Sequence, residues 1–173
     1  MQYLNQFVIN FTGLKLGAHE FNFELDNTFF EHFNYNDFNS CKISTEVILN
    51  KKSNLLELSF RSSGTINLNC HVSNEPFNFP HSNNLNLVVK FSPDTIDDNE
   101  EFLVLPVGSS QINVSQYIYE MIILSLPIKI THPGVEDGTL KSKTLTMLRD
   151  YENNVHKTEN KIDPRWDKLK DLI

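Results

Sequence analysis

The sequence predicts an α+β fold: an antiparallel meander sheet, or a partly open barrel, covered by one main helix over about residues 114–126. Two observations carry this prediction. Apolar and polar residues alternate over most of residues 7–91, which is the pattern of strands with one buried face. Residues 111–133 contain the one long stretch with helical periodicity. A short C-terminal helix completes the prediction.

Two strands are predicted near the start of the chain, over residues 7–11 and 20–25, because apolar and polar residues alternate in both. Asp26 or Asn27 follows and can accept hydrogen bonds from the first free N–H groups of a helix. We therefore expect a single helical turn that contains the phenylalanines up to Phe33.

Four further alternating segments predict a meander of antiparallel strands. Their core-facing residues are, segment by segment, Cys41, Ile43, Val47 and Leu49; Leu56, Leu58 and Phe60; Ile66, Leu68, Cys70 and Val72; and Leu85, Leu87, Val89 and Phe91. Turns are expected at residues 50–54, 62–64 and 81–84, where polar residues and glycine gather. These connections are short enough for hairpins.

Local signals bound the main helix. Asn113 can cap its first N–H groups, and Gln116 can complete a capping box with it. Pro127 should end the helix, because proline disfavours helix in the residue before it. The residues expected to face the core are Val114, Tyr117, Ile118, Met121 and Ile122, with Ser125 one turn further on.

Length and composition favour one globular domain over residues 1–133 and a polar tail over residues 134–173. The short C-terminal helix, docked on or near the domain, is expected where Asp163 can act as a cap and Pro164 takes the first helical position. No run approaches the ~20 apolar residues of a membrane span. The N-terminus lacks the features of a secretory signal, so we expect a soluble, cytoplasmic protein.

The net charge of −7 is unevenly distributed. Residues 1–140 hold seven basic and sixteen acidic residues, which gives −9, whereas residues 141–173 hold eight and six, which gives +2. An acidic body is unsuited to gripping phosphates by counterion release. The acidic segment is either a solvated loop or a surface for a basic partner, and its charged residues are Asp94, Asp97, Asp98, Glu100 and Glu101.

No pattern predicts a catalytic residue, a cofactor or a metal. The chain has no Gly-rich phosphate loop and no His-Glu-x-x-His or Gly-x-Ser-x-Gly motif, and the acidic segment lacks the central glycine of a calcium loop. Cys70 and His71 are residue types that bind zinc. However, adjacent residues of a strand point to opposite faces, so Cys70 is expected to be a buried structural thiol, as is Cys41.

Four motifs together resemble the YceD family of large-ribosomal-RNA accumulation proteins. They are Phe11-Thr12-Gly13-Leu14-Lys15-Leu16-Gly17-Ala18-His19-Glu20-Phe21-Asn22-Phe23, Gly64-Thr65-Ile66-Asn67-Leu68-Asn69-Cys70, Leu126-Pro127 with His132-Pro133 after it, and Asp163-Pro164-Arg165-Trp166-Asp167-Lys168-Leu169. The resemblance extends over nearly the whole chain, and the sequence looks like that of a Bacteroidetes member of the family. It implies a bacterial, cytoplasmic, non-enzymatic factor for accumulation of large-subunit (23S) ribosomal RNA and assembly of the large ribosomal subunit.

The sequence departs from the family at its cysteines. Many members carry Cys-x-x-Cys at the end of the strand that contains Cys70, and often another cysteine after the Leu-Pro. Here Ser73 replaces the second cysteine, and residues 131–134 offer no thiol. Cys70 is therefore at most a remnant of a family cysteine pair, and no metal is expected.

Two modes of action remain open. The first is binding of a basic large-subunit ribosomal protein or an assembly intermediate through acidic surface, with ribosomal RNA contacted indirectly; the resemblance favours such a partner, and charge complementarity would raise the rate of association. The alternative is direct binding of ribosomal RNA by the basic residues of the tail, which are Lys141, Lys143, Arg149, Lys157 and Lys161. No membrane partner is expected.

Overall fold

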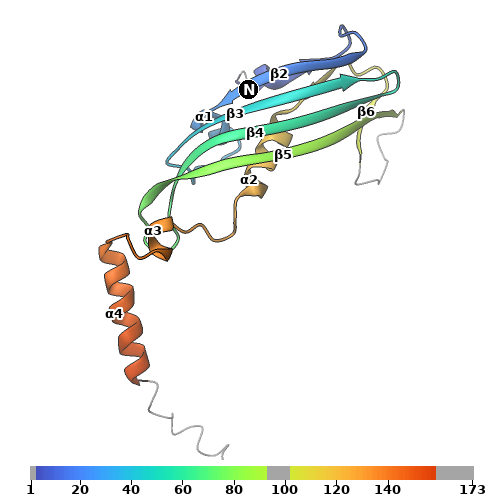
Figure 1. Ribbon diagram of the computed structural model, residues 1–173. Coiled ribbons are helices and arrows are strands. Elements are labelled where there is room, and N and C mark those ends of the chain that lie inside the picture. The colour runs from blue at the N-terminus through green and yellow to red at the C-terminus, as the bar shows by residue number, and fades with distance from the viewer. Residues whose placement is uncertain (1–2, 93–101, 159–173) are drawn as a thin grey trace, which may run out of the picture. The chain divides into compact units, whose positions relative to one another are not determined.

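The structure is a computed structural model that describes residues 3–92 and 102–158, with side chains as far as residue 154 (Figure 1). Its strands are β1 (Val8–Asn10), β2 (Gly17–Leu25), β3 (Ser40–Lys51), β4 (Leu55–Asn69), β5 (Pro76–Ser92), β6 (Leu103–Pro106) and β7 (Gln111–Asn113). Its helices are the 3-10 helix η1 (Tyr3–Phe7) and the α-helices α1 (Asn27–Glu31), α2 (Ser115–Ser125), α3 (Pro133–Glu136) and α4 (Lys143–Thr158).

The chain divides into two compact units. Unit 1 consists of Met1–Asn69 and Pro76–Ile130, and unit 2 consists of Cys70–Glu75 and Thr131–Ile173. Unit 2 therefore combines the short turn between β4 and β5 with the C-terminal part of the chain. The boundary between a domain and a tail near residue 133 stays a prediction of the sequence.

A five-stranded sheet in the order β2-β3-β4-β5-β6 forms the centre of unit 1. Its first four strands are an antiparallel meander, and β6 adds to β5 in parallel. A separate two-stranded sheet pairs β1 with β7. The α+β class and the antiparallel meander are confirmed, and the sheet is open rather than closed into a barrel. No helix of the described residues is long and apolar enough to cross a membrane.

Two of the predicted turns are wrong. β4 and β5 run without interruption through residues 62–64 and 81–84, where Ser63 pairs with Ser82 and Gly64 with His81. The polar residues that suggested turns instead supply polar side chains to both faces of a continuous ladder. The strand predicted over residues 66–72 ends earlier, because β4 stops at Asn69 and a turn follows.

The core lies between the inner face of the sheet and the helices of unit 1. The burial pattern of β3 and β4 alternates as the sequence predicts. Phe33 of the α1 region stacks on Tyr119 of α2, with ring centroids 4.4 Å apart and planes at 11°. The largest fully buried side chains are Phe7, Phe29, Phe30, Phe60, Ile9, Ile43, Leu49, Leu56, Leu58, Ile66, Ile118 and Ile122. Each stabilises the fold by roughly 1.5–3 kcal/mol through burial.

The short helix α1 is confirmed, and Asp26 caps it by accepting a hydrogen bond from the Thr28 N–H at 3.0 Å. The N-terminal strand is shorter than predicted, because residues 3–7 form η1 and only Val8–Asn10 are strand. Pairing with the short β7 sets this limit, since both strands have three residues.

Helix α2 ends at Ser125, two residues before Pro127, as predicted. Asn113 does accept a hydrogen bond from the Ser115 N–H at 2.9 Å, but Gln116 bonds to Glu120 instead of reaching back, so the capping box is absent. The predicted inner face is confirmed: the buried residues are Val114, Ile118, Met121 and Ile122, with Tyr117 and Ser125 half-buried. Ser115, which is not among the residues predicted to face the core, is also buried.

Unit 2 contains α3 and α4. The imidazole Nδ1 of His132 caps α3 by accepting a hydrogen bond from the Gly134 N–H at 2.8 Å. Helix α4 was not predicted from the sequence, because its polar composition is typical of a tail. Its first turn is held by buried Ser142, whose hydroxyl donates to Glu75 at 3.1 Å, and by buried Leu145. The predicted helix that follows Asp163 lies outside the described residues.

Candidate functional site

One face of the sheet in unit 1 is open. Helices α1 and α2 lie behind the sheet in Figure 1, and no described element of unit 1 covers its front. Because side chains alternate along a strand, every second residue of β2 to β5 points to this face. These residues are mostly Asn, Ser and Thr, among them Asn22, Ser44, Ser59, Ser63, Thr65, Asn67, Asn69, Asn78, Ser82, Asn84 and Asn86.

The middle of the open face is hollowed into a polar depression of about 580 Å³. Its lining includes the outward-facing Ser44, Glu46, Arg61, Ser63, Ser82 and Asn84, together with Ser62 and Asn83, whose side chains lie on the inner face. This is the stretch of β4 and β5 in which the sequence suggested turns. The serines at these positions have small side chains, which leaves room above the paired backbones of the strands.

The asparagines at one end of the open face form a chain of hydrogen bonds. The Asn39 amide donates to Asn67 at 3.1 Å and to Asn69 at 2.8 Å, and the Asn67 amide donates to Asn78 at 2.8 Å. An amide group both donates and accepts, so such an array matches the backbone groups of a bound polypeptide.

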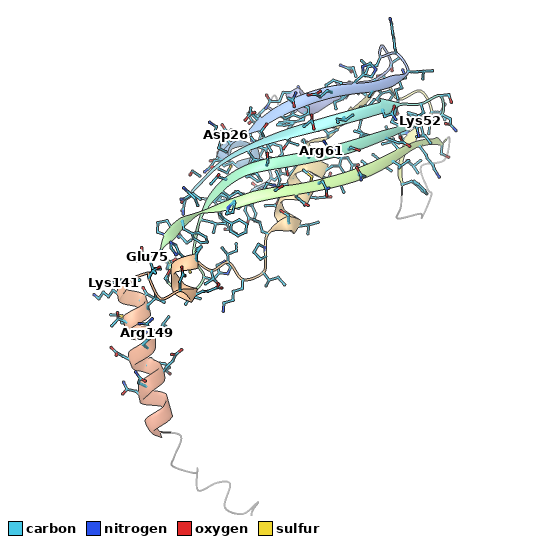
Figure 2. The ribbon with its side chains drawn as sticks, in the orientation of Figure 1. Asp26, Lys52, Arg61, Glu75, Lys141 and Arg149 are labelled. Carbon is cyan, nitrogen blue, oxygen red and sulfur yellow. The ribbon has the colours of Figure 1, made fainter. Side chains whose placement is uncertain are left out.

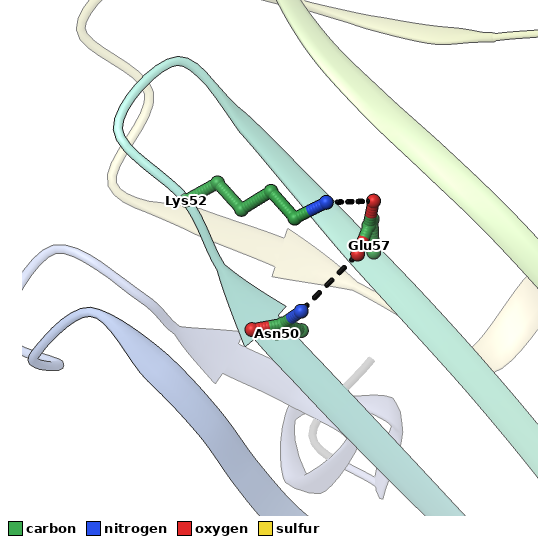
Figure 3. A network of polar contacts seen from close by, with 3 residues as sticks. All are labelled: Asn50, Lys52 and Glu57. Carbon is green, nitrogen blue, oxygen red and sulfur yellow. Dashed lines mark hydrogen bonds and ion pairs between the residues drawn. The ribbon is translucent and has the colours of Figure 1, made fainter.

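Two of the three basic side chains at the outward positions of β2 to β5, Arg61 and Lys90, are engaged within the chain, as is Lys52 in the turn after β3, whereas Lys42 is exposed on β3. Lys52 pairs with Glu57, which also accepts a hydrogen bond from Asn50 at 3.1 Å (Figure 3). The hydrogen bond from Lys52 lowers the pKa of the Glu57 carboxyl, because it stabilises the charged form. Arg61, in the middle of the sheet, lies 3.8 Å from Glu46 (Figure 2).

Lys90 is engaged in another way, since its ammonium lies 3.5 Å from the centre of the Phe102 ring. This geometry is a cation–π contact. The outward positions of β2 to β5 also carry no aromatic side chain on which a base could stack. The open face thus lacks both free cationic clusters for phosphates and aromatic platforms for bases.

A polar cluster lies on the opposite, inner face of the sheet, and sequence analysis did not predict it. Ser62 Oγ lies 2.7 Å from His81 Nε2, and Ser125 Oγ of α2 lies 3.3 Å from His81 Nδ1. The Asn83 amide donates to the Met121 carbonyl at 2.8 Å. A serine beside a histidine can be a nucleophile and its base. Here both are buried, and the second ring nitrogen faces a hydroxyl instead of a carboxylate, so the cluster holds α2 on the sheet.

In unit 2, the thiol of Cys70 accepts backbone N–H groups. The donors are Val72 at 3.4 Å, Ser73 at 3.4 Å and His132 at 3.3 Å. Burial raises the pKa of Cys70, but these hydrogen bonds outweigh it and hold the pKa at about 7. Burial raises the pKa of Cys41 to about 12, so the two thiols differ widely.

The Cys70 turn brings together the positions at which the family resemblance places cysteines. Ser73 and His132 both lie against the Cys70 sulfur, through their backbone N–H groups. His71 is exposed. Among residues 3–92 and 102–154, no group of three or more His, Cys, Asp and Glu side chains could hold a metal ion.

Of the remaining candidate residues of the sequence, the structure describes the side chains of Lys141, Lys143 and Arg149. The acidic segment from Asp94 to Glu101 lies outside the described residues. Lys141 precedes α4, and Lys143 and Arg149 are exposed on it. The side chains of Lys157 and Lys161 are outside the described part of the chain. Asp150 and Glu152 accompany these basic residues on α4.

Comparison with known proteins identifies the family. The family model described as "Large ribosomal RNA subunit accumulation protein YceD" matches residues 58–173, which is 116 of the 173 residues. The match begins within β4 and includes the Cys70 turn and α2. Comparisons with curated proteins and with solved structures found no match. The chain belongs to the YceD family of large ribosomal RNA subunit accumulation proteins.

Proposed function

We propose that this chain is a non-enzymatic, cytoplasmic bacterial factor that supports accumulation of 23S ribosomal RNA by binding a basic large-subunit ribosomal protein or an assembly intermediate. The observation that carries the proposal is the open face of the sheet, which is polar, hollowed and uncovered by the described elements of unit 1. A large exposed surface without a catalytic cluster suits binding more than chemistry.

Electrostatics favours a basic protein over naked RNA as the ligand of this face. Unit 1 holds thirteen acidic and seven basic residues, which gives −6. Lys52, Arg61 and Lys90 are engaged with Glu57, Glu46 and Phe102, so few cations remain to release counterions from phosphates. Lys51 is also engaged, because its ammonium donates to the carbonyls of Phe11 and Leu14.

The open face is large enough for a specific interface. The four long strands have 9, 12, 15 and 17 residues. At ~3.3 Å per residue and ~4.8 Å per strand they span roughly 800 Å². This matches the ~800 Å² that one partner contributes to a standard protein interface.

The alternative function, direct RNA binding by the tail, rests on Lys141, Lys143, Arg149, Lys157 and Lys161. Of these, Lys141, Lys143 and Arg149 are exposed, and unit 2 as a whole holds eight basic and nine acidic residues, which gives −1. No structural observation favours this alternative over a solvated surface. Binding of the purified chain to naked 23S ribosomal RNA, with no ribosomal protein present, distinguishes the two.

The test is capture from a bacterial lysate treated with nuclease, with the full chain as bait. We expect recovery of a basic large-subunit protein that survives the nuclease and is lost at high salt. The double variant Ser63→Arg/Ser82→Arg, at exposed paired positions of the open face, should abolish recovery, because it fills the depression and repels a basic partner. Thr146→Arg/Asn153→Arg on α4 is the matched control and should retain it. Equal recovery by both variants would remove the open face from the proposal.

A further inference from the structure

Strand β2 is an unpaired edge of the sheet. All nine residues Gly17–Leu25 pair with β3, and no described strand pairs with the other side of β2. Half of its backbone N–H and C=O groups therefore face outward along ~30 Å. Proteins usually protect such an edge with charged side chains, above all lysine, or with proline, a bulge or a very short strand. β2 has no proline or lysine, and its register with β3 is continuous.

The opposite edge shows the contrast. β6 has four residues, Leu103–Pro106, and ends in a proline. A strand of this length offers few backbone groups, and proline offers no N–H. Of the two edges in the described sheet, only β2 provides a long, regular template.

The side chains of β2 specify what could pair with it. Glu20, Asn22 and Glu24 are exposed on the open face, and Phe21 and Phe23 are half-buried on the inner face. The Asn22 amide donates to Glu20 Oε1 at 3.0 Å, which keeps that carboxylate on the open face. Side chains of an added strand would lie ~5 Å from these residues. Basic residues would meet the two carboxylates, and apolar residues would cover the two rings.

We infer that β2 is the binding site for an extended segment of the partner protein, in which Lys or Arg alternates with apolar residues. This inference rests on the proposed function and names how the basic partner is recognised. Backbone hydrogen bonds supply affinity in such strand addition, and the alternating side chains supply specificity. The strand lies before residue 58, outside the part of the chain that the family model matches.

A second copy of this chain fits the edge poorly. Pairing two β2 strands antiparallel places Glu20 and Glu24 of both copies on one face. Four carboxylates would then gather along one short ribbon, and like charges on neighbouring strands destabilise the pair. A basic strand replaces this repulsion with attraction.

The direct test is hydrogen exchange of the full chain with a capped peptide of about ten residues that alternates Lys and Val. The amides of β2 should exchange at least about tenfold more slowly with peptide bound, because half of them gain acceptors. Two control peptides of the same sequence carry N-methyl groups on alternate residues, one on the odd-numbered and one on the even-numbered residues. Only the peptide whose methyl groups replace the N–H groups that face β2 should lose the slowing of exchange. Binding that leaves the exchange of β2 unchanged would overturn the inference.

Charge variants sharpen the result. Glu20→Lys/Glu24→Lys should weaken peptide binding by about tenfold or more. Asp150→Lys/Glu152→Lys on α4 changes the net charge equally and should leave binding unchanged. Equal weakening by both variants would show non-specific attraction to charge and contradict the inference. Protection of β2 that rises with protein concentration in the absence of peptide would assign the edge to a second copy instead.

The same variants separate this inference from the proposed function. If the lysate capture succeeds with wild-type chain and equally with Glu20→Lys/Glu24→Lys, the proposed function stands and the edge is not the site. If no basic protein is captured, the proposed function fails, and the peptide experiment still decides what β2 can bind.

Discussion

The hydroxyl of Ser62 lies 2.7 Å from Nε2 of His81, and both residues are buried at the middle of the sheet. The hydroxyl of Ser125 faces the other ring nitrogen at 3.3 Å. A neutral imidazole can use one nitrogen as donor and the other as acceptor, so both hydroxyls fit the uncharged ring. These two contacts join β4, β5 and α2 in the region where the sequence predicts turns at residues 62–64 and 81–84.

Acid should destabilise unit 1 through His81. Burial lowers the pKa of this imidazole below its ordinary value of about 6.5. The imidazole is therefore protonated at a higher pH in the unfolded chain than in the folded chain. The stability that the neutral imidazole contributes is present above pH ~6.5 and is lost as the pH falls below ~6.5. Urea unfolding at neutral pH and about one unit below pH 6.5 should show this loss. His81→Gln should reduce the pH dependence; an identical dependence in both proteins would contradict the assignment.

Two hydroxyl deletions at neighbouring positions should act in opposite directions. Thr45 is paired with Ser62, and its buried Oγ1 has no hydrogen-bond partner among the described residues. Thr45→Val should raise the free energy of unfolding by about 1 kcal/mol, because it removes an unsatisfied polar group. Ser62→Ala should lower it by about 1–3 kcal/mol, because it leaves His81 without its partner. Chemical denaturation measures both; destabilisation by Thr45→Val would contradict the account.

Gly64 should not tolerate a side chain. A Cβ at this position would lie 2.2 Å from the Lys42 carbonyl oxygen and 2.7 Å from the Ile43 Cα. Both atoms belong to the backbone, so Gly64→Ala must push β3 away from β4 and should cost about 1–3 kcal/mol. Gly13→Ala is the control, because no atom lies within 4 Å of its Cβ position. Equal free energies of unfolding for the two variants would contradict the close approach of the β3 backbone to Gly64.

Cys70 should titrate near pH 7 in the folded protein. In a Cys41→Ser background, the ultraviolet absorbance of the thiolate should rise with a midpoint near 7, since three backbone N–H groups favour the anion. The lowered pKa adds stability that is present above the ordinary thiol pKa and is lost as the pH falls through about 7. A midpoint at the ordinary value of about 8.5 would contradict this geometry.

Replacing Cys70 tests the absence of a metal. Cys70→Ser should lower stability, because the thiol is buried and accepts hydrogen bonds from two segments of unit 2. It should leave the metal content of the purified protein unchanged. Stoichiometric zinc in the wild-type protein that disappears in the variant would show that Cys70 is a ligand.

The sequence predicted what periodicity can reveal. The inner faces of β3 and α2 and the cap at Asp26 follow from alternation, helical spacing and local side-chain chemistry. The continuous strands through Ser62 and His81 could not be predicted in this way, because their polar residues are explained by each other and by α2, which are far apart in the sequence.

The candidate site was less accessible to sequence analysis than the fold. The open, polar face of the sheet is formed by Asn and Ser residues that alternate with apolar residues. Such residues are common at the outward positions of any strand, so the sequence alone does not mark them as a binding surface. Only the pairing of Ser63 with Ser82 brings these residues into one depression. Helix α4 was missed for a related reason: Ser142 anchors it to Glu75 in the Cys70–Glu75 turn, which is distant in the sequence.

The central claim is that the ligand is a basic protein and not naked RNA. Equilibrium binding of the purified full chain to RNA-free large-subunit proteins and, separately, to naked 23S ribosomal RNA at moderate salt tests this most directly. The account predicts saturable binding to at least one basic protein, weakened by salt, and no retention of RNA. Retention of naked ribosomal RNA with no bound protein from the large subunit would contradict it.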